Sequence, residues 1–297
     1  MKKIFFFALF VLAGCNESQN MLETSTMKSE TQLIELKLLN PVKDTTTNSV
    51  IPFTESCMSQ VDTCWYTIQK SANDKSLPTV NVSFNGRKLS LEQAVDVTIV
   101  VDKKTSDDIE TLNIILRGLP KGSTHEQYRT LIYTLLGKIK ESGWSHFFLP
   151  EDPRISGSQI EKISSPEYVL GQYVSSHPWL DPDYKLDLKR WLKIGSFYNW
   201  YFYNNGAYLH LKAWRQNDDE APTEKATYLI TLEFQSEKKF WQDGISDEKD
   251  RLHWKELLPK RLKSYHAARL ALEEKARAAG IEIDESYQDP PIRALQE

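Results

Sequence analysis

The chain has 297 residues, of which 40% are hydrophobic and 26% are charged. These are ordinary values for a folded globular protein, and they exclude a wholly disordered chain. The formal net charge of −4 argues against a dedicated nucleic-acid binder. No apolar run reaches the length of about 18 residues that a membrane-spanning helix needs.

The first residues have the layout of an export signal, and we assign residues 1–14 to a signal peptide. Lys2 and Lys3 form a basic start, and the apolar run 4–12 is too short to span a bilayer. Residues 12–15 (LAGC) resemble the lipobox of bacterial lipoproteins. The resemblance implies cleavage before Cys15 and a stable anchor of several acyl chains, such as palmitate, on the mature N-terminus. The alternative is an ordinary signal peptide followed by a chance cysteine.

Asn16 stands where enterobacterial lipoproteins of the inner membrane carry Asp. By this resemblance we expect the periplasmic face of the outer membrane, with membrane contact through the lipid anchor only. Residues 15–32 are rich in Ser, Thr, Glu and Asn without an apolar period, which predicts a flexible tether. A random coil of this length spans about 20–25 Å, so the folded part would stand clear of the lipid headgroups.

Cys57 and Cys64 remain as an even pair once Cys15 is assigned to the lipid anchor. In an oxidising compartment, such a pair predicts a disulfide that closes a short loop. A metal-binding pair and two free thiols are the alternatives. Zinc is disfavoured because no histidine or second cysteine pair lies nearby in the sequence.

The N-terminal half, residues 33–150, combines several strand patterns with one clear helix. Strands are predicted at 65–70, 79–84, 95–101 and 111–117, with a turn at Asn85-Gly86. Ser123 and Glu126 have the spacing of a capping box, and apolar residues then recur at helical spacing until Gly143. Residues 144–149 are predicted to return as a strand.

Residues 151–190 form a Pro-rich connector, and residues 191–297 form the C-terminal half. Strands are predicted at 197–203, 207–214 and 227–234. A helix is predicted from about 247 to 279, which Pro259 should kink or divide. The predicted fold class is therefore α+β, with two antiparallel strand–strand–helix units joined by the Pro-rich connector.

The most unusual segment is the aromatic run 197–203 (FYNWYFY). On a strand, Tyr198, Trp200 and Phe202 share one face. We expect one face of the strand to be core and the other to bind a partner, because Tyr and Trp dominate binding hot spots. The expected contact residues are Tyr201, Tyr203, Asn204 and Asn205. Carbohydrate stacking and a strand buried on both faces are the alternatives.

Motifs for catalysis are sparse. The common hydrolase, metalloprotease, P-loop and dinucleotide motifs do not occur in the sequence, so we predict neither enzymatic activity nor a cofactor. Ser236 and Lys239 match a Ser-x-x-Lys pattern, but the companion motifs of the enzymes that use this pattern do not occur in the sequence. His177 and the Asp-Pro-Asp segment 181–183 have the chemistry of a cation site, but such segments more often form turns. The basic run 255–277 is interpreted as a solvated helix face with local ion pairs.

The whole set of features resembles the immunity lipoproteins of type VI secretion systems, notably those that neutralise phospholipase effectors in the periplasm. The lipobox, the pair Cys57 and Cys64, and the two α+β halves carry this resemblance. It implies an inhibitor that binds a secreted antibacterial toxin and blocks its active site. The alternatives are an envelope-assembly or cell-wall-associated lipoprotein that docks an envelope protein, and a hydrolase with dispersed catalytic residues.

Overall fold

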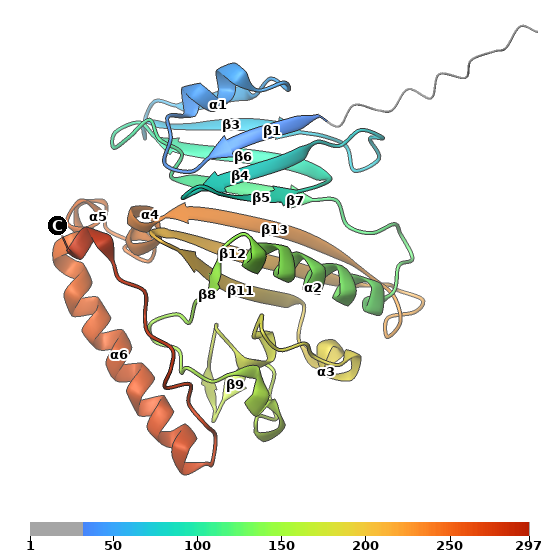
Figure 1. Ribbon diagram of the computed structural model, residues 1–297, viewed down its shortest axis with the longest axis vertical. Coiled ribbons are helices and arrows are strands. Elements are labelled where there is room, and N and C mark those ends of the chain that lie inside the picture. Colours follow the sequence, from blue (N-terminus) through green and yellow to red (C-terminus); the bar gives the residue numbers. More distant parts are fainter. Residues whose placement is uncertain (1–31, 297) are drawn as a thin grey trace, which may run out of the picture. The chain divides into compact units, whose positions relative to one another are not determined.

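The computed structural model describes residues 32–296. The predicted signal peptide, the lipidation site Cys15 and residues 15–31 of the tether lie outside the described residues. The centre of the described part is an antiparallel sheet of eight strands in the order β2-β3-β6-β7-β13-β12-β11-β8 (Figure 1). In that order the strands are Thr54–Met58, Thr63–Gln69, Ala94–Asp102, Thr111–Leu116, Ala226–Ser236, Ala207–Asn217, Phe197–Asn204 and Ser145–His146.

Strands from both halves of the chain meet in this one sheet at β7 and β13. The two strands pair antiparallel from Leu116 opposite Ile230 to Thr111 opposite Gln235. The mixed α+β class is confirmed, but the expected division of the strands into two separate units is wrong. Both strands are rich in buried apolar residues, and an unpaired edge there would leave backbone groups without partners.

A second sheet of three strands packs on the same core. It consists of β1 (Leu33–Lys37), β4 (Thr79–Phe84) and β5 (Arg87–Leu91), and β1 runs parallel to β4. The predicted turn at Asn85-Gly86 joins β4 to β5, and both residues have positive φ, 49° and 73°. An Asn-Gly pair tolerates this geometry well. The short helix α1 (Val42–Asn48) follows β1.

The main helix α2 (His125–Glu141) has a capping box, although not the predicted one. The Gln127 amide donates to the Thr124 hydroxyl over 3.2 Å, and the Thr124 amide donates to the Gln127 side chain over 2.8 Å. Ser123 instead donates to the Pro120 carbonyl. The prediction was wrong by one residue because adjacent Ser-Thr and Glu-Gln pairs offer the same pattern twice. Tyr128 of α2 stacks on Tyr228 of β13 at 4.6 Å between ring centroids.

The Pro-rich segment that follows β8 packs into the protein. It contains 3₁₀ turns at Gly157–Lys162 and Pro178–Leu180, the hairpin β9 (Tyr168–Val169) and β10 (Gln172–Tyr173), and helix α3 (Leu188–Lys193). Its buried apolar residues are part of the main core; they are Ile155, Ile160, Ile163, Val169, Val174, Trp179, Leu180, Leu186 and Trp191. The prolines thus shape a buried and irregular segment.

Three helices follow β13: α4 (Glu237–Gln242), α5 (Glu248–Leu252) and α6 (Trp254–Ala278), with a 3₁₀ turn at Arg293–Leu295 near the end. The predicted long helix divides at His253, whose φ of −100° and ψ of 21° depart from helical values. Pro259 lies inside α6, so the expected division at Pro259 is wrong. Within residues 32–296, no helix combines the length and the apolar character needed to cross a membrane.

The main sheet has two unequal faces. Alternate residues such as Ile114, Tyr228, Ile230 and Leu232 are buried against α2, the second sheet and the Pro-rich segment. The remaining alternate residues are partly exposed over most of the sheet. We call these two sides the core face and the open face. A smaller core of Phe147, Tyr208, Trp241, Trp254 and Leu258 lies where the C-terminal helices meet the end of the open face.

Candidate functional site

The open face is built from cross-strand rows, because directly paired residues of antiparallel strands point to the same side. One row holds Thr67, Thr98, Asn113, Glu233, His210 and Tyr201, and the next holds Gln69, Asp96, Ile115, Thr231, Lys212 and Asn199. Every residue of these two rows is partly or fully exposed. The rows cross β3, β6, β7, β13, β12 and β11, so both halves of the chain contribute to the open face.

The most exposed apolar residues of this face form a third row. Phe197, Trp214 and Leu229 pair directly across β11, β12 and β13. Their exposed fractions are 68%, 45% and 44%. Three large apolar side chains side by side in water are unfavourable for an isolated protein, and such patches commonly mark interaction sites. We define this row as the aromatic row.

The charges of the open face are largely paired within it. Lys212 lies 2.6 Å from the Glu233 carboxylate. The Asp96 carboxylate accepts hydrogen bonds from Gln69 over 3.1 Å and from Thr98 over 2.8 Å. Most other residues of the two central rows are neutral and polar. The surface therefore offers apolar contact and hydrogen bonds, which is typical of protein interfaces.

The predicted alternation of the aromatic strand is confirmed. Tyr198, Trp200 and Phe202 lie on the core face and are at most 1% exposed. The other face of β11 is divided by position along the strand. Phe197 is at its exposed end, whereas Tyr201 and Tyr203 pack against the smaller core under the C-terminal segment.

The four residues predicted to bind a partner lie at this covered end. The Tyr203 hydroxyl donates to the Pro291 carbonyl over 3.3 Å. Asn204 is buried, and Asn205 accepts hydrogen bonds from Arg293 and Asn85 at the hairpin turn. Partner contact at Tyr201, Tyr203, Asn204 and Asn205 therefore stays a prediction, and the aromatic row is the more accessible part of the same face.

His210 illustrates the environment between the covered end and the aromatic row. Its ring stacks on Tyr201 at 4.3 Å between centroids, and its Nε2 lies 2.9 Å from the Asn199 side-chain oxygen. Burial, together with the nearby Lys212 charge, lowers the pKa of His210 to about 3. The ring is therefore neutral at physiological pH, and it contributes packing and hydrogen bonding to this face rather than charge.

One edge of the sheet carries the predicted disulfide. Cys57 of β2 and Cys64 of β3 are directly opposed in register and are joined by a disulfide. The enclosed loop exposes Met58 and Val61, which are 52% and 49% accessible. The disulfide thus closes the tip of an edge hairpin whose outer strand has no buried residue.

The residues weighed as cation ligands, His177 and the segment 181–183, take part in turns. His177 caps a 3₁₀ turn by accepting the Trp179 amide over 3.2 Å, and it is not grouped with Asp181 and Asp183. The structure brings His146 to these two carboxylates instead. The Asp181 carboxylate already accepts backbone amides, including that of Gly157 over 2.6 Å, and Lys140 binds Asp183 over 2.7 Å. These contacts fix a turn and use part of the acceptor capacity of the two carboxylates.

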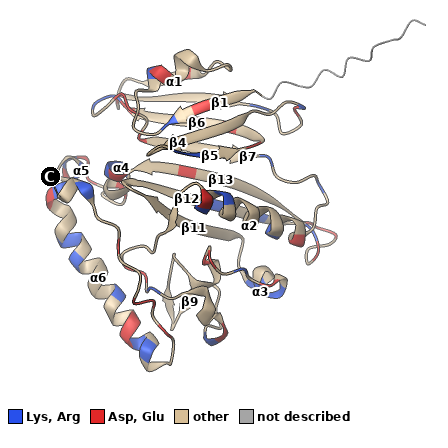
Figure 2. Cartoon of the chain, viewed as in Figure 1, with Lys and Arg blue, Asp and Glu red and all other residues tan. Residues whose placement is uncertain are grey.

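The remaining sequence motifs also have structural partners. The Ser236 hydroxyl caps α4 by accepting the Lys239 amide over 3.0 Å. Figure 2 shows basic residues spread along α6. Two of them are paired internally: Arg269 lies 2.7 Å from Asp289, and Arg277 binds Glu285. Both partners lie in the segment that follows α6, and Arg269 is only 5% exposed. The interpretation of the run 255–277 as a solvated face with local ion pairs is therefore wrong at Arg269.

No known protein family, characterised protein or solved structure is detectably similar to this chain. The candidate site therefore rests on the geometry of the open face.

Proposed function

We propose that this chain is a partner-binding lipoprotein of the bacterial envelope, and that it binds and inhibits a secreted antibacterial toxin through its open face. The aromatic row of Phe197, Trp214 and Leu229 is the observation that carries the proposal. It combines exposed apolar area with a polar surround, which is the composition of an interface core and its rim.

The size of the open face suits a protein partner. Five strand-to-strand steps of about 4.8 Å separate β3 from β11, and outward residues repeat about every 6.8 Å along each strand. The three rows therefore cover roughly 500 Å² of backbone surface, without the additional area of protruding side chains. A standard interface buries about 800 Å² on each partner, so the open face supplies most of one side.

The envelope location and the inhibitory role come from the sequence. The lipobox at 12–15 implies a lipid anchor on the periplasmic face of the outer membrane, and the tether gives the folded part reach. A toxin delivered into the periplasm would meet a high local concentration of such an inhibitor. The resemblance to type VI immunity lipoproteins suggests a phospholipase effector. In this view each half of the chain is a strand–strand–helix unit, and both units supply strands to one shared docking surface.

The proposal is tested by capture and titration. The chain is used to capture proteins from envelope extracts of cells exposed to a type VI attacker, and the captured partner is then titrated. Phe197→Ala and Trp214→Ala should each weaken binding at least tenfold, because anchors carry most of the binding energy. Tyr173→Ala is the matched control, since Tyr173 is 64% exposed on β10 and belongs to none of the three rows of the open face.

Two results would contradict the proposal. Unchanged affinity of both variants would remove the open face as the docking surface. Capture of a resident envelope protein, with no loss of activity of any secreted toxin, would favour the docking lipoprotein over the toxin inhibitor.

A further inference from the structure

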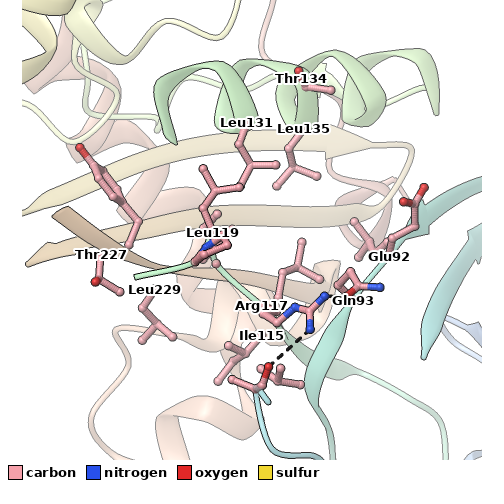
Figure 3. A pocket seen from close by; sticks show the side chains of 18 of the residues that line it. Glu92, Gln93, Ile115, Arg117, Leu119, Leu131, Thr134, Leu135, Thr227 and Leu229 are labelled. Atoms are coloured by element: carbon pink, nitrogen blue, oxygen red, sulfur yellow. Dashed lines mark hydrogen bonds between the residues drawn. The ribbon is translucent and has the colours of Figure 1, made fainter. Parts of the chain in front are cut away.

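An apolar groove lies beside α2 and borders the open face, since Ile115 and Leu229 are among its lining residues. Its volume is about 890 Å³. It runs between α2, the end of β5, the end of β7 with the loop that follows, and the start of β13 (Figure 3). This volume is in the range of sites that hold a small molecule.

The wall and floor of the groove are formed by residues at the edge of the main core that remain partly exposed. Leu116, Leu119 and Leu131 pack against that core but remain partly exposed. Figure 3 shows Leu131 and Leu135 directed from α2 toward the groove, with Leu119 opposite them. Apolar walls on both sides of an open channel favour a ligand with a long apolar part.

The rim of the groove carries more positive than negative charge. Arg117, Lys121 and Lys138 line it, and Glu92 is the carboxylate among its lining residues. Lys138 pairs with Glu92 over 3.2 Å. This pair neutralises one cation and leaves the other two for a ligand.

The two remaining cations are held differently. The Arg117 guanidinium donates to the Gln93 side chain and to the carbonyls of Ala72 and Asp74, at 3.5 and 3.4 Å. These three acceptors are neutral, so they orient the guanidinium without cancelling its charge. Lys121 is exposed and has no hydrogen bond or ion pair to any residue within 32–296. Both cations line the groove with their charge available to an anionic group.

We propose that the groove binds a long-chain carboxylate, a free fatty acid, at a site that shares Leu229 with the aromatic row but goes beyond the function proposed for the open face. The acyl chain lies between Leu131 and Leu119, and the carboxylate is bound by Arg117 and Lys121. The apolar walls supply the affinity for the chain, and the two cations supply the preference for an anionic head over a neutral one.

Binding is tested with palmitate in detergent-free buffer, by displacement of a fluorescent fatty acid. The chain carries Cys15→Ser, so that no acyl anchor competes for the groove. Saturable binding of one palmitate is expected. Each methylene removed from the ligand should weaken binding by up to about fourfold. Hexadecanol, which has the same chain without the charge, should bind at least tenfold more weakly.

Two variants locate the ligand. Leu131→Trp fills the groove and should weaken palmitate binding more than tenfold, while Leu270→Trp at an exposed position of α6 should not. Lys121→Gln should weaken palmitate binding but leave hexadecanol binding unchanged. Lys189→Gln on α3 is its control. The Lys121 variant changes an exposed side chain, so it decides the question even if Leu131→Trp fails to fold.

Several results would overturn the proposal. These are the absence of saturable palmitate binding, equal affinity for palmitate and hexadecanol, and unchanged palmitate affinity in a folded Leu131→Trp variant. Association with anionic phospholipid vesicles without binding of monomeric palmitate would also overturn it, since the rim would then recognise a membrane surface.

Discussion

At the scale of single residues, position along a strand decides whether an aromatic side chain supports the fold or remains available to a partner. Tyr201 and Phe197 are on the same face of β11, yet Tyr201 packs against the smaller core and Phe197 is 68% exposed. The alternation of the two faces could be predicted from the sequence. The covering of one end could not, because the residues that cover it, such as Pro291 and Arg293, lie about ninety residues later.

This difference predicts opposite outcomes for two alanine substitutions. Tyr201→Ala should lower the free energy of unfolding by about 2 kcal/mol, less than for a fully buried aromatic residue because Tyr201 is partly exposed. Phe197→Ala should change the free energy of unfolding by less than about 0.5 kcal/mol. Urea unfolding curves of both variants give the comparison. Equal losses would show that Phe197 is also part of the packed structure.

Asp152 provides a test by pH, because it is a buried carboxylate. It is 4% exposed, and its Oδ2 accepts the Ser176 amide over 2.6 Å. Burial raises the pKa of Asp152 to about 6, compared with about 3.9 in an unfolded chain. Between these values the folded state holds a proton that the unfolded state has released. The contribution of Asp152 to stability is therefore present below about pH 4 and is lost as the pH rises through 6.

Asp152→Asn removes this ionisation and keeps an oxygen acceptor for the Ser176 amide. The stability of the variant relative to the natural protein should therefore rise by about 2–3 kcal/mol between pH 4 and pH 8. Denaturant unfolding of both proteins at several pH values measures this difference and cancels the histidine contributions common to both. A difference that does not change with pH would mean that Asp152 ionises normally in the folded protein.

At the scale of elements, local patterns predicted most strands and the main helix, while pairing over long distances escaped prediction. The strands at 79–84 and 111–117 were placed to within a residue. The exposed β2 and the charged β5 were missed, because neither has the apolar content of a buried strand. The pairing of β7 with β13 joins residues more than a hundred positions apart, and no local periodicity encodes it.

The hairpin of β2 and β3 yields a prediction at this scale. The disulfide encloses a short loop, since Cys57 and Cys64 are separated by 7 positions. Replacing both cysteines with serine should lower the free energy of unfolding by about 2.5 kcal/mol through the greater entropy of the unfolded chain. The variant is compared with the oxidised protein in urea. Two thiols that react with an alkylating agent before reduction would contradict the disulfide itself.

At the scale of the whole molecule, one sheet has a filled face and an open face. Helix α2, the second sheet and the Pro-rich segment cover the core face, and the C-terminal helices reach only one end of the open face. Such an arrangement keeps a broad surface rigid, because the strands from β3 to β11 that form it are anchored from behind by packed side chains. A rigid surface loses little conformational entropy on binding, which suits a tight inhibitor.

Side-chain footprinting of the captured complex tests the central claim most directly. Hydroxyl-radical oxidation labels exposed aromatic residues, and mass spectrometry reads Trp214, Phe197 and Tyr173 separately in the free and bound protein. If the open face is the docking surface, Trp214 and Phe197 become protected on binding while Tyr173 is labelled as before. Protection of Tyr173 with unchanged labelling of Trp214 and Phe197 would contradict the account and place the partner elsewhere.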